Sequence, residues 1–275
     1  MARDIYTRLN EIDDATLRNI AQMLERRGNH PQQVAMRTAY LNKLGDITGL
    51  QVLEIGCGTG VVTRELARRI GPGGRLVGSD PSHGMITVAR ELAEAEGTPV
   101  IEFAVQDAGN LPYPDATFDL VCAVTVFSHV PAREAVLREV ARVTKPGGRV
   151  LIVDGDFAAN QIAHPDQETT TRIITAWRAN VVDDPYLTRR LGPLVAGAGL
   201  TMGAVDGHIH VEAGHVDEGT SFMLQWAQFA AQQGVQAGAV TEEQAAAWTA
   251  EVRAMNQQNL LFGSVTFISV VCERP

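Results

Sequence analysis

The segment that most restricts the fold is VLEIGCGTG, Val52–Gly60, in which a strand-like run leads into three glycines at alternate positions. Residues Gln51–Ile55 form a mainly apolar run typical of a buried strand. Beyond the glycines, Val62, Leu66 and Ile70 recur at the spacing of one helix face. Because glycine has no Cβ, the backbone can turn tightly there and a ligand can approach closely. A strand, a glycine turn and a helix in this order predict a βα unit whose turn faces a ligand.

The alternation of short apolar runs with helical periodicity continues to about residue 157. Alternation at this spacing predicts βαβ units, and hence a mainly parallel sheet covered by helices on both faces. Further strands are predicted at Arg75–Ser79, Val100–Val105, Phe118–Thr125 and Arg149–Asp154. The helices between them are predicted at about residues 61–70, 84–96 and 132–144. The fold class is therefore expected to be α/β.

The two ends of the chain differ from this middle part. Residues 4–44 have helical periodicity throughout, with a break at Gly28–Pro31. Beyond Asp154, helices are predicted at about 166–182, 187–198, 217–233 and 242–259, and strands at 201–212 and 264–273. We expect a single domain, 1–275. Its parts are a helical cap (1–48), a core (49–157, 187–212 and 262–275) and helical insertions forming a lid (158–186 and 213–261).

Composition narrows the kind of partner. The 275 residues are 45% hydrophobic, enough for a full core, and the 23 Lys+Arg against 32 Asp+Glu leave a net charge of −9. An acidic chain without a basic run is a poor candidate for binding nucleic acid. No apolar run approaches the ~20 residues of a membrane helix, and Met1–Asp14 contains no signal-peptide core. Three cysteines fit a reducing compartment. We expect a cytoplasmic protein, monomeric or homodimeric, that acts on a small molecule, with no nucleic-acid or membrane partner.

The glycine turn departs from the dinucleotide fingerprint. That fingerprint is G-x-G-x-x-G, whereas the third glycine comes one residue early here, giving G-x-G-x-G. Glu54, within the first strand, is placed where its carboxylate would repel a phosphate and hold an amino group. Both features disfavour a nicotinamide dinucleotide.

Two more acids follow later strands. Asp80 comes 20 residues after Gly60, where an acid can accept hydrogen bonds from ribose hydroxyls. Asp107 follows the third predicted strand and could accept from an exocyclic amine of adenine, with Met85 beside the ring. Either acid alone could simply cap a loop, but acids at successive strand ends predict a nucleoside-type ligand.

At this point the chain resembles the class I S-adenosylmethionine-dependent methyltransferases. The similarity is dense over residues 49–156 and looser elsewhere. It rests on VLEIGCGTG, on GSDPSHGM (Gly78–Met85), on QDAGNLPYPDATFDLV (Gln106–Val121) and on RVTKPGGRVLIVD (Arg142–Asp154). Small-molecule members, the sugar and natural-product O-methyltransferases and the quinone C-methyltransferases, are the most similar in these segments.

The resemblance implies a Rossmann-like sheet of seven strands in the order 3-2-1-4-5-7-6, with the last strand antiparallel. It implies S-adenosylmethionine as the cofactor and S-adenosylhomocysteine as its product. The implied cofactor-binding residues are Glu54, Gly56, Cys57, Gly58, Gly60, Asp80, Pro81, Met85, Gln106, Asp107, Ala108 and Thr125.

The reaction needs alignment of donor and acceptor, and an alcohol or phenol acceptor also needs a base. His129 follows the fourth strand, and Asp154 ends the fifth, beside it in the expected sheet order. We therefore predict O-methylation of a small molecule, with His129 as general base and Asp154 as its carboxylate neighbour. Two alternatives stay open: His129 could only pack beside the cofactor, and Asp156 competes with Asp154 for the same role.

The acceptor pocket is predicted to be apolar. Its expected lining is Phe157, Trp177, Phe222 and Trp226, which lie in or beside the insertions. His208, His210 and His215 lack a cysteine pair or a carboxylate of clear ligand spacing, so no metal is predicted. Carbon or nitrogen methylation remains an alternative, as does a protein of this fold that binds S-adenosylmethionine without methyl transfer.

Overall fold

The computed structural model describes residues 4–98 and 101–275. Its described part contains an eight-stranded sheet. The strands are β1 Gln51–Ile55, β2 Arg75–Asp80, β3 Glu102–Val105, β4 Phe118–Val124, β5 Thr144–Gly155, β6 Gln161–Ile162, β7 Thr201–Gly214 and β8 Leu261–Glu273. Val100, the predicted start of the third strand, lies outside the described residues.

The sheet has the order β3-β2-β1-β4-β5-β8-β6, and β7 also pairs with β8. Within β1 to β5, neighbouring strands are parallel. Strand β8 is antiparallel to both β5 and β7. With β7 and β8 as the sixth and seventh core strands, the predicted order 3-2-1-4-5-7-6 and the Rossmann-like α/β class are confirmed. The short β6 is an addition that pairs with β8 just beyond the end of β5.

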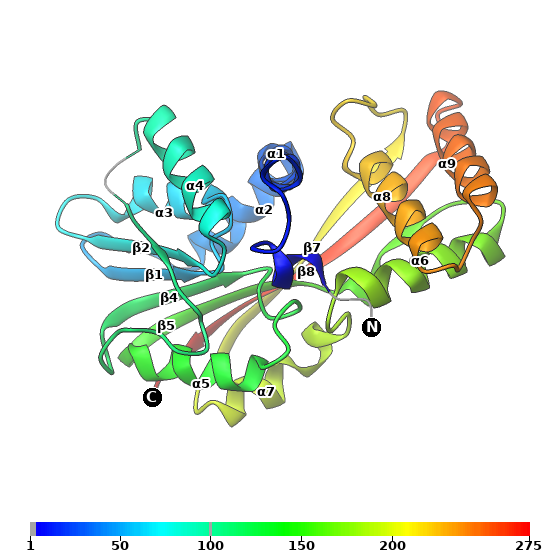
Figure 1. Cartoon of the computed structure of the whole chain (residues 1–275). Coiled ribbons are helices and arrows are strands. Elements are labelled where there is room, and N and C mark those ends of the chain that lie inside the picture. The colour runs from blue at the N-terminus through cyan, green and yellow to red at the C-terminus, as the bar shows by residue number, and fades with distance from the viewer. Residues whose placement is uncertain (1–3, 99–100) are drawn as a thin grey trace.

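The helices lie on both faces of the sheet and beyond its edge (Figure 1). The α-helices are α1 Asp14–Asn29, α2 Pro31–Asn42, α3 Val61–Ile70, α4 His83–Ala95, α5 Arg133–Val143, α6 Gln167–Val181, α7 Leu191–Gly197, α8 Phe222–Gln236 and α9 Glu242–Gln257. Short 3₁₀ helices are η1 Ile5–Arg8, η2 Phe157–Ala159 and η3 Leu187–Arg190. No helix of residues 4–98 or 101–275 is long and apolar enough to cross a bilayer.

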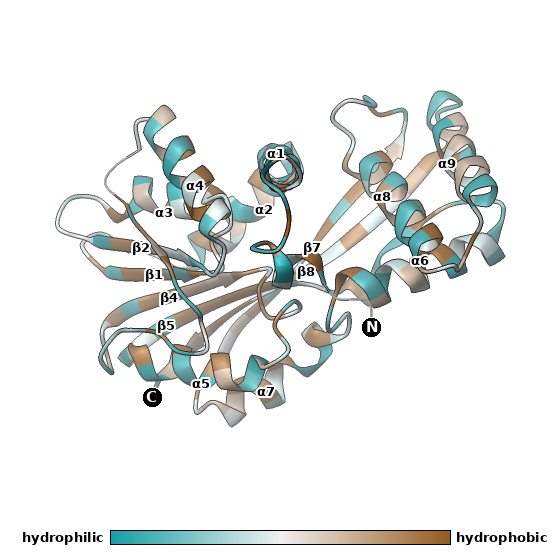
Figure 2. Ribbon diagram, in the orientation of Figure 1, coloured by the Kyte–Doolittle hydropathy of each residue, from teal (hydrophilic) through white to brown (hydrophobic). Residues whose placement is uncertain are grey.

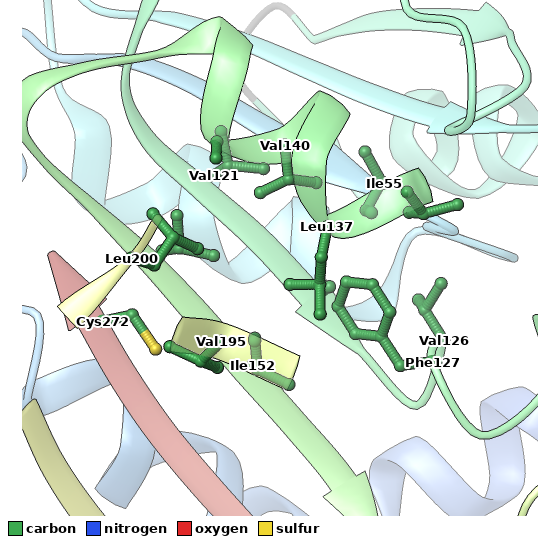
Figure 3. Close-up of a cluster of buried hydrophobic side chains, with 14 of the residues drawn as sticks. Ile55, Val121, Val126, Phe127, Leu137, Val140, Ile152, Val195, Leu200 and Cys272 are labelled. Atoms are coloured by element: carbon green, nitrogen blue, oxygen red, sulfur yellow. The ribbon is translucent and has the colours of Figure 1, made fainter. Parts of the chain in front are cut away.

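The central strands bury both of their faces because successive side chains point to opposite sides. In β5, Val150 and Ile152 pack with α5 and α7, whereas Leu151 and Val153 pack with α2 and α3. Figure 3 shows part of the first cluster, where side chains of α5 meet those of the sheet. Figure 2 shows the same arrangement as largely hydrophobic central strands between helices with mixed surfaces. This double burial explains why these strands are apolar runs rather than alternating ones.

A separate apolar cluster joins α6, α8 and α9 to β6 and to the N-terminal half of β8. It contains Trp177, Trp226 and Trp248, all buried. Trp248 Nε1 donates to Thr170 Oγ1 at 2.9 Å, which ties α9 to α6. Strands β7 and β8 run past the core to reach these helices (Figure 1). The two insertions therefore form one helical layer at the edge of the molecule.

Two boundaries differ from the sequence prediction. Helix α8 begins at Phe222 rather than near residue 217, because Asp217 accepts the N–H of Thr220 and Ser221 then caps the helix. Strand β5 begins at Thr144 rather than at Arg149, so it includes the Lys145–Gly148 segment that the prediction leaves between helix and strand. That segment is held in the sheet by backbone hydrogen bonds to Arg274.

Candidate active site

The glycine turn after β1 is tightly packed at two of its glycines and open at the third. Gly56, Gly58 and Gly60 have φ of 62°, 53° and 80°, the left-handed region that favours glycine. A Cβ on Gly56 would lie 2.6 Å from Val126, and one on Gly60 would lie 3.2 Å from Phe103. A Cβ on Gly58 would have only Leu24 within reach, at 3.9 Å. Gly56 and Gly60 therefore permit close packing, whereas Gly58 leaves open space for a ligand.

Asp80 connects this turn to the end of β2. Its two carboxylate oxygens accept the N–H of Ser82 at 2.8 Å and that of Gly58 at 2.9 Å. Burial raises the pKa of Asp80, and these two backbone donors oppose the rise. Each carboxylate oxygen has a second lone pair, so Asp80 can still accept hydrogen bonds from ligand hydroxyls.

Glu54 is a buried carboxyl group at the floor of the same region, 2% exposed. The hydroxyl of Thr63 donates to its Oε2. Burial raises the pKa of Glu54 to about 8, since the Thr63 hydrogen bond only partly offsets it and the negative Asp80 adds to it. A cationic ligand group would stabilise such a buried carboxyl group strongly, because a positive neighbour favours its ionised form.

A cavity of about 450 Å³ opens over these groups. This volume lies within the ~300–1,000 Å³ typical of small-molecule sites. Ten predicted cofactor-binding residues line it: Glu54, Gly56, Cys57, Gly58, Asp80, Pro81, Met85, Asp107, Ala108 and Thr125. Gly60 and Gln106 are not in its lining, since Gly60 faces Phe103 and the Gln106 amide donates to Tyr113. The cavity fits a nucleoside that carries an amino acid. Gly58 leaves open space, the buried Glu54 can bind an amino group, and Asp80 can bind hydroxyls.

A second cavity, of about 110 Å³, lies beside the first under the helical layer. Its lining includes all four residues predicted for the acceptor pocket, Phe157, Trp177, Phe222 and Trp226. Three of these rings are in contact: Phe157 lies 6.0 Å from Trp177, and Trp177 lies 5.2 Å from Trp226, between ring centroids. The cavity is thus an aromatic chamber.

His129 lies where the two cavities meet and lines both of them. Its Nδ1 is 2.5 Å from Oδ2 of Asp4, which is buried at the start of η1. Tyr6 packs on the His129 ring with centroids 4.7 Å apart and, like Arg27, also lines both cavities. Sequence reasoning missed Asp4, Tyr6 and Arg27. Asp4 is 125 residues from His129, and no local pattern links them.

Asp154, the carboxylate expected beside His129, lies near it but forms its hydrogen bonds with backbone groups. Asp154 is fully buried and accepts the N–H of Ser128 at 3.1 Å and that of Gly155 at 2.9 Å. Burial raises its pKa, and the nearby His129 opposes the rise. Asp156 pairs with Arg189 at 3.3 Å. Asp4 is therefore the acid that contacts the imidazole, while Asp154 fixes the loop that carries it.

A histidine pair and a carboxylate meet away from the cofactor cavity. His30 Nε2 and His210 Nε2 lie 3.4 and 3.2 Å from Glu212 Oε1, close enough for a shared cation. However, His30 Nδ1 accepts the N–H of Gln32, so its Nε2 carries the proton that points to Glu212. Ser221, Phe222 and Met223 also donate to Glu212. The cluster is thus arranged as a hydrogen-bonded anchor for α8. His208 instead contacts Ser269, and His215 contacts the carbonyl of Asn256.

A mainly parallel α/β sheet, with a cavity of small-molecule size at the carboxyl ends of β1 and β2 and a second cavity beside it, is the arrangement expected of a class I methyltransferase. The comparisons agree with this. A methyltransferase domain family matches residues 53–152. Demethylmenaquinone methyltransferase of Lactobacillus johnsonii is 30% identical over 173 residues, which cover 61% of this chain and 71% of that protein. The chain belongs to the class I S-adenosylmethionine-dependent methyltransferases, which confirms the predicted enzyme class and cofactor.

Other relatives extend the comparison. The ubiquinone/menaquinone biosynthesis C-methyltransferase UbiE of Hahella chejuensis is 36% identical over 123 residues, covering 44% of this chain and 49% of that one. A methyltransferase structure from Aquifex aeolicus superposes with a TM-score of 0.52 at 21% identity, covering 70% of this chain and 92% of that one. The chain spans about half the length of several of its curated relatives.

Proposed function

We propose that this protein transfers a methyl group from S-adenosylmethionine to a hydroxyl oxygen of a small aromatic molecule. One observation carries the proposal: His129, paired with Asp4 at 2.5 Å, stands at the junction of a nucleoside-sized cavity and an aromatic chamber. The proposed acceptor lies in the chamber, with its hydroxyl group at that junction.

The large cavity would hold the cofactor through the groups described above. Glu54 would bind its amino group, Asp80 its ribose hydroxyls and Asp107 the adenine amine, and Gly58 would leave room for the chain between them. When bound, S-adenosylmethionine supplies a methyl group on a positively charged sulfur, which is already strongly electrophilic. The protein's part is therefore to position the acceptor, to exclude water and to manage one proton.

His129 would remove that proton. With Nδ1–H donated to the carboxylate of Asp4, Nε2 is the nitrogen free to accept a proton from the acceptor hydroxyl. Asp4 keeps the imidazole in this tautomer and offsets the positive charge it gains. As the O–H bond breaks, its electron pair stays on the acceptor oxygen, which becomes the nucleophile, and the proton passes to Nε2. The ring chain from His129 through Phe157 to Trp177 would limit the access of water to this position once the acceptor is bound.

Carbon methylation is the second candidate, and the relatives favour it. UbiE is named a C-methyltransferase, and the Lactobacillus johnsonii protein is named for demethylmenaquinone. The same base could serve, because removing a phenolic proton also makes the neighbouring ring carbons nucleophilic. A cytoplasmic location and a monomeric or homodimeric state stay predictions.

Labelled methyl transfer tests both candidates. The protein is incubated with S-adenosylmethionine carrying an isotopic methyl group and with substituted phenols and hydroquinones, and the product's methyl position is read by mass spectrometry and NMR. An O-methyl product supports the proposal, and a ring C-methyl product supports the second candidate. If S-adenosylmethionine binds but no acceptor of either kind is methylated, both are rejected in favour of a binding protein of this fold.

Two substitutions test the role of His129. His129→Gln should lower kcat by roughly 10²–10⁴, the contribution typical of a general base. Asp4→Asn should lower kcat by roughly tenfold with little change in KM, because the base remains but loses its orientation. His83→Gln is the matched control, since His83 is exposed at the start of α4 and lines neither cavity. A loss below about tenfold in His129→Gln would reject the base role.

A further inference from the structure

The aromatic chamber contains two polar groups that the fold leaves without partners. Trp177 is 3% exposed and Trp226 is 7% exposed, and both line the chamber. The Nε1–H of each indole has no hydrogen-bond partner among the described residues. A buried donor left unpaired is costly and rare, because it has lost its bonds to water without replacement.

The third tryptophan shows what the same fold does elsewhere. Trp248 is equally buried, in the same helical layer, but its Nε1 donates to Thr170 Oγ1 at 2.9 Å. It is not in the lining of the chamber. Among the three tryptophans, the two whose indoles lack partners are therefore the two that line the chamber, as expected if a ligand supplies the missing acceptors.

The charge of the chamber agrees with an acceptor-bearing ligand. Its described lining includes Arg26 and Arg27 but no Asp or Glu, although the whole chain carries a net charge of −9. The remaining lining is mostly aromatic and aliphatic, including Phe157, Phe222 and Phe229. Such a lining favours a neutral aromatic ring bearing an oxygen that accepts hydrogen bonds, and disfavours a cationic amine.

We propose that Trp177 and Trp226 form an oxygen-recognition subsite, in which their indole N–H groups bind a carbonyl or ether oxygen on the ring of the methyl acceptor. The two rings meet edge to face with centroids 5.2 Å apart, so the two indoles adjoin each other in one part of the chamber lining. The subsite lies beyond Phe157 from His129, so it fixes the end of the acceptor remote from the reacting hydroxyl. It deepens the proposed function, on which its description of the ligand as a methyl acceptor rests.

The test uses two probes of nearly equal shape, acetophenone and ethylbenzene, which differ by one carbonyl oxygen. The chain has three tryptophans, so its indole ¹H–¹⁵N spectrum has three signals, and each single Trp→Phe variant assigns one of them. Acetophenone should shift the Trp177 and Trp226 signals downfield and leave that of Trp248 in place. Ethylbenzene should enter the chamber without the downfield shift, because it offers no acceptor.

Affinities from the same titrations give a second readout. The acetophenone-to-ethylbenzene affinity ratio should fall roughly fivefold in Trp177→Phe and in Trp226→Phe, since each loses one donor but keeps a ring. Trp248→Phe is the matched control and should keep the wild-type ratio. An unchanged ratio in both chamber variants, or failure of the wild-type chamber to bind either probe, would overturn the subsite. Neither titration requires methyl transfer, so failure of the proposed reaction would be seen separately in the labelling assay.

Discussion

At the scale of single residues, the cofactor site depends on acids held out of water. Glu54 and Asp80 are buried close to each other, and burial raises the pKa of both. This arrangement is unfavourable for the empty protein, because two carboxylates cannot both ionise easily in a confined space. A ligand with a cationic amino group and with hydroxyl donors would offset both the burial of the two carboxylates and their mutual repulsion.

The raised pKa of Glu54 predicts a proton exchange on binding. With a pKa of about 8, Glu54 is mostly protonated at pH 7, and a cationic amino group should drive its ionisation. Binding of S-adenosylhomocysteine at pH 7 should therefore release most of one proton. Calorimetry in two buffers of different ionisation enthalpy measures this release.

The release should vanish in Glu54→Gln, which has no proton to lose, and persist in Glu94→Gln, whose side chain is exposed on α4. Equal release by wild-type protein and Glu54→Gln would show that Glu54 does not meet the amino group.

Residues of the site that belong to a short sequence motif can be predicted, whereas residues brought together from distant segments cannot. The glycine turn, Glu54 and Asp80 belong to short motifs at strand ends, so their positions follow from the strand pattern. The pairing of His129 with Asp4 joins segments 125 residues apart, and only the packed fold reveals it. The same distance explains why Asp4 was missed, whereas Asp154, a neighbour in sheet order, could be predicted near His129.

At the scale of elements, the junction of β7 and α8 controls the helical layer over the chamber. Glu212, near the end of β7, accepts the N–H groups of Phe222 and Met223 at the start of α8. It also lies within 3.4 Å of His30, between α1 and α2. One carboxylate therefore connects the N-terminal helices, the sheet and the helical layer, and no pattern in the sequence predicts this connection.

Replacing Glu212 should loosen that junction. Burial alone would raise its pKa, but hydrogen bonds from His210, Ser221 and the backbone lower it to about 2. A lowered acid pKa adds stability above the ordinary value near 4.5, and that stability is lost as the pH falls towards 2. Glu212→Gln should lower Tm by about 5 °C at pH 7, from the loss of charged hydrogen bonds, with a shrinking difference below pH 4.5.

The matched control is Glu218→Gln, an exposed glutamate in the same connection. It should leave Tm within about 1 °C of wild type, as surface substitutions usually do. A Glu212→Gln variant with wild-type Tm, or a difference that grows with acidity, would contradict the anchoring role.

The elements themselves were largely predictable. Strand and helix periodicity placed the core strands and the helices of both insertions, because burial imposes those periods directly. The predicted helix boundary was wrong where side chains compete for backbone N–H groups, as at Asp217 and Ser221 before α8. The short β6 was missed because two residues are too few to show any period.

At the scale of the whole molecule, two cavities of different character meet at one histidine. The larger is lined by the parallel core and the N-terminal helices, and the smaller by the helical layer and α1, while Tyr6 of the N-terminal segment lines both. The proposed cofactor site thus lies mainly against the family's core, and the proposed acceptor chamber lies against the insertions.

We expect the cavity over Glu54 and Asp80 to bind S-adenosylmethionine, and calorimetric titration measures this binding. S-adenosylmethionine and S-adenosylhomocysteine should each bind at one site per chain, and Asp80→Asn should weaken both by roughly tenfold through loss of charged hydrogen bonds to the ribose. NAD should show no saturable binding. Tight binding of NAD with no binding of either sulfur nucleoside would contradict the account.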